Sequence, residues 1–131
     1  MQPIQDLYAL LNQPRKVVIT THQKPDADAM GSSLALRHFL VQFGHTVTVI
    51  SPTNWAGWVD WMPGTKEVMD YEKERGKADA ILNQADWVFC LDFNIFHRTK
   101  SMTEKLKQLT CTKILIDHHQ EPDEASFDYG V

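Results

Sequence analysis

The sequence has 131 residues, 43% hydrophobic and 23% charged, which is enough to bury a core and suits one domain of average composition. Its formal net charge of -4 and pI of 5.8 exclude binding of long duplex nucleic acid through a broad basic surface. Because there is no apolar run of about 18 residues and no signal-peptide pattern, we expect a cytoplasmic protein without membrane contacts. Cys90 and Cys111 lie in or beside apolar runs and are expected as buried thiols.

The order of apolar and polar residues predicts alternating helices and strands. Apolar residues at helical spacing, as in IQDLYALLN, indicate helices, and short apolar runs such as KVVIT indicate strands. Pro14 and Gly44 mark two helix ends. In chain order we expect a helix at 4–12, a strand at 16–20, a polar loop at 21–32, a helix at 33–43, a strand at 46–50, a short strand at 66–71, a helix at 74–84, a strand at 87–92, a short helix at 103–110 and a strand at 113–117.

The stretch NWAGWVDWM, residues 54–62, is the least regular. Trp55, Trp58 and Trp61 lie three residues apart, which suits a short helix with one aromatic face. Such a face could stack nucleic-acid bases. Covering the sheet or a neighbouring domain is the more common role of clustered tryptophans, and we expect that role here.

Strands that alternate with helices indicate a parallel sheet with right-handed crossovers. The runs KVVIT, WVFCL and KILI are continuously apolar, as expected when both faces of a sheet are covered. The expected fold class is therefore α/β, a Rossmann-like three-layer domain with a mostly parallel sheet flanked by helices. In such open sheets, ligands bind beyond the carboxyl ends of the strands.

Acidic and histidine residues follow three of these strands, where a parallel sheet would bring them to one edge. They are His22, Asp26 and Asp28 after the first strand, Asp92 at the end of the fourth, and Asp117, His118 and His119 at the end of the last. Two carboxylates about 4 Å apart repel by about 4 kcal/mol at an effective dielectric of about 20, so this edge needs positive charge. Nearby basic residues are few, chiefly Lys24 and Arg98.

Carboxylates and imidazoles are ligands of first-row divalent ions, and the absence of thiols at this edge argues against a structural zinc site. We therefore expect Mn²⁺ or Mg²⁺, with manganese favoured by the histidines. Two such ions sharing a bridging carboxylate could activate a water and stabilise the leaving oxygen of a phosphate ester.

Each motif alone also has a simpler explanation. An aspartate such as Asp28 before a helix is often only an N-cap. Asp92 could be a turn former at a strand end, and His118 with His119 could be a solvated pair in a loop. It is the occurrence of all three motifs at one predicted edge that favours a metal site.

Together the motifs resemble those of the DHH phosphoesterase family. HQKPDADAMGS is similar to the first family motif HxxPDxDAxGS, the strand-end aspartate of LDFN to the second, and DHH to the third. The similar stretch runs from His22 to His119 and covers most of the chain. Within the family, the closest resemblance is to the nano-RNase branch of oligoribonucleases and 3′-phosphoadenosine 5′-phosphate phosphatases, which also begins with a helix before its first strand.

The resemblance implies a role for each matching residue. Five residues match ligands of two manganese ions: His22 and Asp26 of the first, Asp28 and His118 of the second, and Asp92 as the bridge between them. The catalytic roles fall to Asp117, which would orient a ligand histidine, and to His119, which would face the substrate phosphate as an electrostatic stabiliser or proton donor. Arg98 matches an arginine that often follows the second motif and is either a substrate-binding or a surface residue.

Two family features do not match within the 131 residues. Family members carry a fourth motif with a further aspartate ligand; Asp123 and Asp128 are available but lie early for it, so we expect this ligand beyond Val131. Family members also have a C-terminal DHHA1 domain that holds the substrate. We therefore expect residues 1–131 to be the N-terminal catalytic part of a longer protein, weakly active or inactive alone.

The expected reaction is attack of a metal-bridging hydroxide on a phosphate ester of a short single-stranded oligonucleotide or of a 3′,5′-bisphosphate. Cleavage of pyrophosphate or polyphosphate is an alternative, because manganese pyrophosphatases share the motif set. Exonuclease action on long DNA fits less well with the acidic composition. A nucleotide-sensing module without catalysis is a further alternative, which the presence of every ligand type disfavours. The resemblance also leaves room for a homodimer of the full-length protein.

Overall fold

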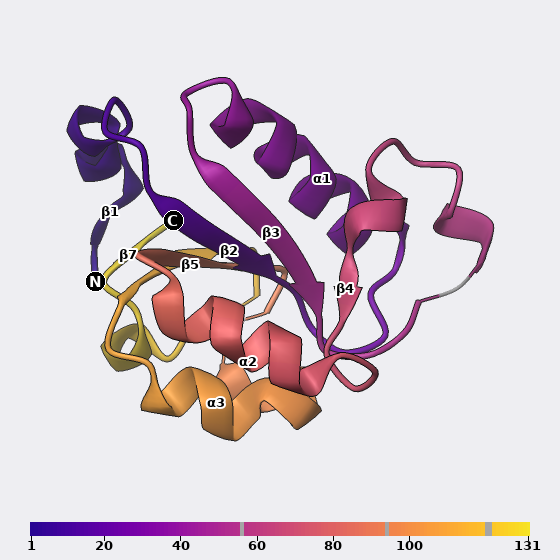
Figure 1. Cartoon of the computed structure of the whole chain (residues 1–131). Coiled ribbons are helices and arrows are strands. Elements are labelled where there is room, and N and C mark those ends of the chain that lie inside the picture. Colours follow the sequence, from indigo (N-terminus) through magenta and orange to yellow (C-terminus); the bar gives the residue numbers. More distant parts are fainter. Residues whose placement is uncertain (56, 94, 120–121) are drawn as a thin grey trace.

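A computed structural model describes residues 1–55, 57–93, 95–119 and 122–131, without the side chain of Trp58. These residues form a seven-stranded sheet in the order β1-β7-β6-β5-β2-β3-β4, in which every pairing is parallel (Figure 1). The strands are β1 (Gln2–Pro3), β2 (Lys16–Thr20), β3 (Thr46–Ser51), β4 (Met69–Asp70), β5 (Trp87–Leu91), β6 (Thr112–Ile116) and β7 (Tyr129–Gly130).

Helices cover both faces of the sheet and complete a three-layer α/β fold. The 3-10 helix η1 (Ile4–Leu10) and helix α1 (Ala27–Val41) pack on one face, where Leu7 and Leu34 join one core cluster. Helices α2 (Arg75–Gln84) and α3 (Thr103–Gln108) and the 3-10 helix η4 (Phe96–Met102) pack on the other (Figure 1), where Leu82 and Leu106 join a second cluster. Three further 3-10 helices are η2 (Gly57–Val59), η3 (Thr65–Glu67) and η5 (Glu124–Ser126).

Strand β5 shows why the central strands are continuously apolar. Trp87, Phe89 and Leu91 point into the core cluster under α1, and Val88 and Cys90 point into the cluster under α2 and α3. All five residues are buried. The sequence-based expectation of a parallel sheet covered on both faces is confirmed, because alternating side chains reach two different cores.

The predicted start of helix α1 is wrong. Residues 21–32 were expected to form a polar loop, but α1 begins at Ala27, six residues before the predicted start. The carboxylate of Asp26 caps this helix by accepting a hydrogen bond from the backbone N–H of Ala29 at 2.9 Å. The first half of the predicted metal-binding motif is therefore a loop, and the second half is the first helical turn. The C-terminal end of α1 agrees with the prediction, since Gly44 adopts a φ of +86° just past the helix.

The short elements differ more from the prediction. The N-terminal helix is a 3-10 helix, and β1, β7 and η4 had no counterpart in the sequence-based scheme. The strand expected at 66–71 is shorter, because η3 occupies its first residues and only β4 forms a strand. Of the helix expected at 54–62, only η2 forms within the described residues, and Ala56 lies outside them. Trp55 packs partly against the core, as expected, whereas the side chain of Trp61 is 74% exposed. None of the described helices is long and apolar enough to span a membrane.

Candidate metal and phosphate site

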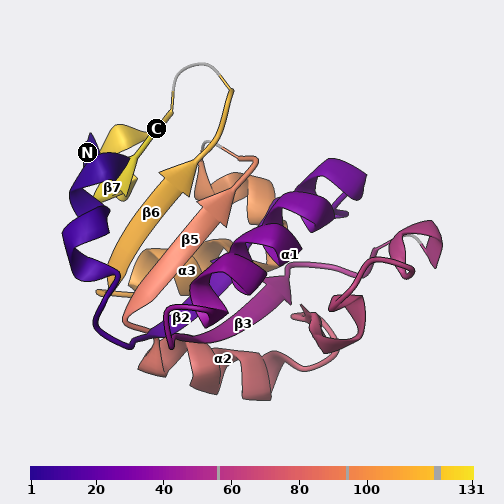
Figure 2. The same cartoon turned by 90° about the horizontal axis from the view of Figure 1, so that it is seen from above.

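The predicted site residues lie at one edge of the sheet because β2, β5 and β6 are adjacent and parallel. Asp92 directly follows β5, and Asp117 directly follows β6, so both leave the sheet at its carboxyl edge. His22 lies in the loop after β2, which leads to Asp26 at the start of α1. The arrowheads of β5 and β6 in Figure 2 point to this common edge.

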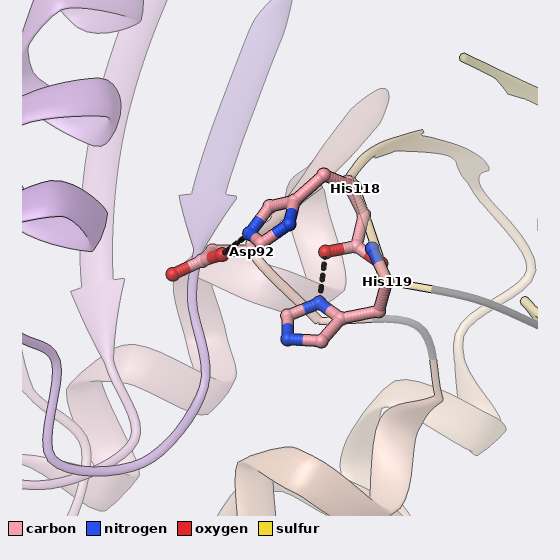
Figure 3. Close-up of side chains that lie close together, drawn as sticks. Asp92, His118 and His119 are labelled. Atoms are coloured by element: carbon pink, nitrogen blue, oxygen red, sulfur yellow. Dashed lines mark hydrogen bonds and ion pairs between the residues drawn. The ribbon is translucent and has the colours of Figure 1, made fainter.

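Asp92 lies between two imidazoles. Its Oδ2 is 3.4 Å from Nε2 of His22. Its Oδ1 is 3.1 Å from Nε2 of His118, the contact drawn in Figure 3. The backbone of Asp92 has a φ of +62°, a left-handed conformation that aspartate tolerates better than most residues, and its N–H donates to the carbonyl of Ile116. The turn that ends β5 thus aims one carboxylate oxygen at each histidine, as a bridging ligand requires.

His22 is held in the tautomer that suits a metal ligand. Its Nδ1 lies 2.6 Å from the backbone carbonyl of Gln23, and since a carbonyl only accepts hydrogen bonds, Nδ1 carries the proton. In a neutral ring of this tautomer, Nε2 carries a lone pair and faces Oδ2 of Asp92 at 3.4 Å, an atom that also carries lone pairs. Two facing lone pairs are stable only with a cation or a proton between them, and the carbonyl-bonded Nδ1 is the usual partner arrangement of metal-binding histidines.

Asp117 is tied to His119. The Asp117 side chain is 2% exposed; one of its oxygens accepts the backbone N–H of His119 at 3.0 Å, and the other lies 2.5 Å from His119 Nδ1. The ring of His119 stacks on that of His118 with centroids 4.6 Å apart. The side chains of His118 and His119 are 76% and 30% exposed, so both imidazoles remain accessible from solvent. The histidine that Asp117 orients in the structure is therefore His119.

Two sets of donor atoms result, and they share Asp92. The first is His22, Asp26 and Asp92, and the second is Asp92, Asp117, His118 and His119; within each set the donor atoms lie within 4.8 Å of one another. Oxygen and imidazole donors without thiolate fit Mn²⁺ or Mg²⁺. Asp28 belongs to neither set. It lines a pocket of about 330 Å³ together with Asp92, Asp117 and His118, so it faces the same space from the first turn of α1.

The remaining candidates lie farther from this cluster. The side chain of Arg98 is exposed, and its backbone carbonyl accepts the N–H of Gln23 at 3.0 Å, which anchors the His22 loop to η4. Asp128 accepts the backbone N–H of Lys113 near the start of β6, at the opposite edge of the sheet, so it is not the fourth aspartate ligand. Asp123 accepts a hydrogen bond from the Ser126 hydroxyl.

Sequence reasoning did not identify a second pocket beside the first donor set. It has a volume of about 740 Å³ and is lined by Gln23, Lys24, Pro25, Asp26, Thr53, Asn54, Trp55 and Glu72. The tryptophan spacing drew attention to Trp55, but no pattern in the sequence placed it next to the loop after β2. That proximity depends on a hydrogen bond between two loops, in which the N–H of Lys24 donates to Oγ1 of Thr53 at 2.7 Å.

Comparison with known proteins agrees with the motifs. Residues 16–129 match the model of the DHH family, N-terminal domain. The structure superposes on the crystal structure of an exopolyphosphatase-related protein from Bacteroides fragilis with a TM-score of 0.92 and 35% identity over 98% of this chain; the match spans 37% of that protein's length. An α-glucosyltransferase in complex with UDP is similar in fold alone, with a TM-score of 0.62 and 14% identity over 82% of this chain and 29% of its own.

No curated protein matches the sequence significantly. The family match covers well over half of the chain, and the Bacteroides fragilis structure shares both its fold and about a third of its residues. The chain therefore belongs to the DHH family, whose N-terminal domain it matches.

Proposed function

We propose that this protein is a manganese-dependent phosphoesterase that hydrolyses short oligonucleotides, 3′-phosphoadenosine 5′-phosphate, or both. The observation that carries the proposal is the position of Asp92, whose two oxygens face His22 and His118 and which belongs to both donor sets. A carboxylate placed in this way is suited to bridge two cations. Membership of the DHH family supports phosphate-ester chemistry at this edge.

Two bound divalent ions would supply Lewis acidity for the phosphate oxygens and a water acidic enough to act as nucleophile. The chain's own residues hold and orient the reactants. Asp92, His22 and Asp26 would hold one ion, and Asp92 with His118 the other, with Asp28 facing the same space. Asp117 fixes the ring of His119 through Nδ1, so that Nε2 of His119 is left to meet a phosphate oxygen or a leaving oxygen.

The charge of the site favours a small substrate. The edge gathers Asp26, Asp28, Asp92 and Asp117, and among the basic residues of the surrounding loops Lys24 and Arg98 have exposed side chains. A long polynucleotide would need a continuous basic track to bind along its backbone. A substrate with one or a few phosphates can instead be held at the acidic edge by the cations alone.

Cleavage of a phosphoanhydride is a second candidate function. The observation in its favour is that the structure with a TM-score of 0.92 is described as an exopolyphosphatase-related protein. Both reactions can use the same cations and the same Asp92, so the metal site does not separate them. They differ in what the site must contact beyond the phosphate.

The experiment that tests the proposal compares substrates with the full-length protein and Mn²⁺. Oligoribonucleotides of two to five residues, 3′-phosphoadenosine 5′-phosphate, pyrophosphate and polyphosphate would be assayed in parallel, with Asp92→Asn as the inactive control. We expect release of mononucleotide or of phosphate from the nucleotide substrates. Turnover of pyrophosphate or polyphosphate alone would favour the second candidate, and calorimetric nucleotide binding without hydrolysis of any substrate would favour a sensing module.

A further inference from the structure

The 740 Å³ pocket adjoins the first donor set, which consists of His22, Asp26 and Asp92. Asp26 belongs to that donor set and also lines the pocket, so a phosphate held at the donor set would lie at the entrance of the pocket. The far wall is formed by the loop after β3, including Thr53 and Trp55. In Figure 1 this loop extends beyond the end of β3, on the same side as the loop that leads into α1.

The walls of this pocket are fixed by hydrogen bonds. Thr53 uses its hydroxyl twice, accepting from the N–H of Lys24 at 2.7 Å and donating to the carbonyl of Asn54 at 3.1 Å. Trp55 donates its indole N–H to Oδ1 of Asp60 at 3.0 Å and packs partly against the core under α1. The indole therefore has its polar group satisfied and its orientation set before any ligand arrives.

The charges of the pocket select against a second phosphate group. Among the described residues that line it, Lys24 is basic, and Asp26 and Glu72 are acidic. A chain of further phosphates would meet net negative charge there. A neutral, flat, aromatic group would meet the indole of Trp55, and stacking on an aromatic side chain tolerates any base because every base has a π-face.

We propose that this pocket binds the base of the nucleotide whose phosphate lies at the metal site, with Trp55 as the stacking surface. This inference rests on the proposed function, and it makes Trp55 a specificity-determining residue that separates nucleotides from inorganic phosphoanhydrides. Trp55 would contribute to the binding of a nucleotide substrate and nothing to the binding of pyrophosphate.

The test is a calorimetric titration of the full-length protein, in the presence of Mn²⁺, with AMP and with ribose 5-phosphate, which lacks the base. We expect AMP to bind about tenfold more tightly than ribose 5-phosphate. Trp55→Leu, which keeps an apolar contact with the core, should remove that difference, and Trp55→Phe should retain most of it. Trp61→Ala is the matched control, because Trp61 is exposed on the same segment and is not among the residues lining the pocket.

A second measurement does not depend on the folding of a variant. In the wild-type protein, the NMR signal of the Trp55 indole N–H should shift on addition of AMP and stay in place with ribose 5-phosphate. The proposal that this pocket binds the base would be overturned if AMP and ribose 5-phosphate bound with equal affinity. It would also be overturned if Trp55→Leu weakened the binding of both compounds equally. Discrimination by Trp55 without hydrolysis of either oligonucleotides or 3′-phosphoadenosine 5′-phosphate would instead overturn the proposed function. Hydrolysis of a nucleotide substrate without discrimination would overturn only the pocket.

Discussion

Asp117 holds His119 at two points, the backbone N–H and the ring Nδ1, from a carboxylate that is almost completely buried. The two contacts fix both the position and the tautomer of the histidine, leaving Nε2 as the atom that can meet a substrate. Under the proposed function, Asp117 would act through His119 as a positioning residue.

Replacing Asp117 with asparagine should lower kcat by about 10- to 100-fold while the domain stays folded, because asparagine has one acceptor oxygen for two donors of His119, the backbone N–H and Nδ1. Steady-state kinetics gives the loss, and the imidazole ¹⁵N shifts of His119 report the tautomer directly. Asp123→Asn is the control, since Asp123 contacts Ser126 and lies outside both donor sets. Unchanged ¹⁵N shifts in Asp117→Asn would remove the positioning role.

Asp92→Asn should abolish turnover and weaken Mn²⁺ binding at least tenfold, because it neutralises the carboxylate shared by both donor sets. The fold should survive, since asparagine also tolerates the left-handed φ of +62°. In the wild type, Mn²⁺ at a hundredfold excess over Kd should stabilise the protein by about 2.7 kcal/mol, a rise in Tm of about 10 °C. The two measurements are calorimetry and thermal unfolding with and without EDTA. If Mn²⁺ raised the Tm of Asp92→Asn as much as that of the wild type, the ions would bind at another site.

Stability should fall at alkaline pH because of Cys90. Complete burial raises the pKa of the Cys90 thiol well above its ordinary value of 9.0. The folded state therefore favours the protonated thiol of Cys90. Its contribution to the free energy of unfolding is fully present below pH 9. This contribution is lost as the pH rises above 9, because the thiol then ionises in the unfolded chain and not in the folded one. The expected slope is about 1.4 kcal/mol per pH unit for this one group.

Urea unfolding at several pH values between 8 and 11 measures this slope. Cys90→Ala should be less stable at neutral pH, because it leaves a cavity, but its stability should decline less steeply with pH. Burial also raises the pKa values of Cys111 and Tyr71, so part of the decline should persist in the variant. If the free energies of unfolding of the wild type and Cys90→Ala fell with the same slope against pH, Cys90 would not be a cause of the decline.

His45 should matter for stability and not for chemistry. It is 4% exposed, its Nδ1 accepts the N–H of Arg15 at 3.1 Å, and its Nε2 lies 3.0 Å from the carbonyl of Leu11. His45→Ala would leave both backbone groups without these partners, at a cost of about 2–4 kcal/mol in the free energy of unfolding. Chemical denaturation tests the cost against His38→Ala, an exposed control on α1. A loss of less than about 0.5 kcal/mol would show that the ring does not anchor this turn.

The sequence predicted the long strands well because each is a continuous apolar run whose side chains fill two cores, as in β5. It placed the start of α1 too late because the composition of DADAMGS is that of a loop. The structure shows that the helix begins there, since the N–H groups of Ala29 and Met30 donate to the side chain and the carbonyl of Asp26. The two-residue strands β1 and β7 are too short to produce a period. Strand β7 pairs with the edge of the longer strand β6, and β1 pairs in turn with β7.

The candidate site was foreseen as far as strand order determines it. His22, Asp92 and His118 meet because their strands are neighbours, and the apolar pattern already implied such a sheet. The partner of Asp117 and the pocket beside Trp55 were not predictable in this way, because both depend on the backbone path of loops. A hydrogen bond such as that between Lys24 and Thr53 joins segments 29 residues apart and leaves no periodic signal.

The left-handed backbone at Asp92 limits which substitutions at this position could abolish hydrolysis and still allow the chain to fold. In a saturation library selected only for folding, position 92 should retain glycine, asparagine and aspartate, whereas selection for turnover should retain aspartate alone. A relative that had kept the fold and abandoned hydrolysis would be expected to carry glycine or asparagine at the equivalent position. That single residue could serve as a diagnostic mark that separates inactive members from active ones.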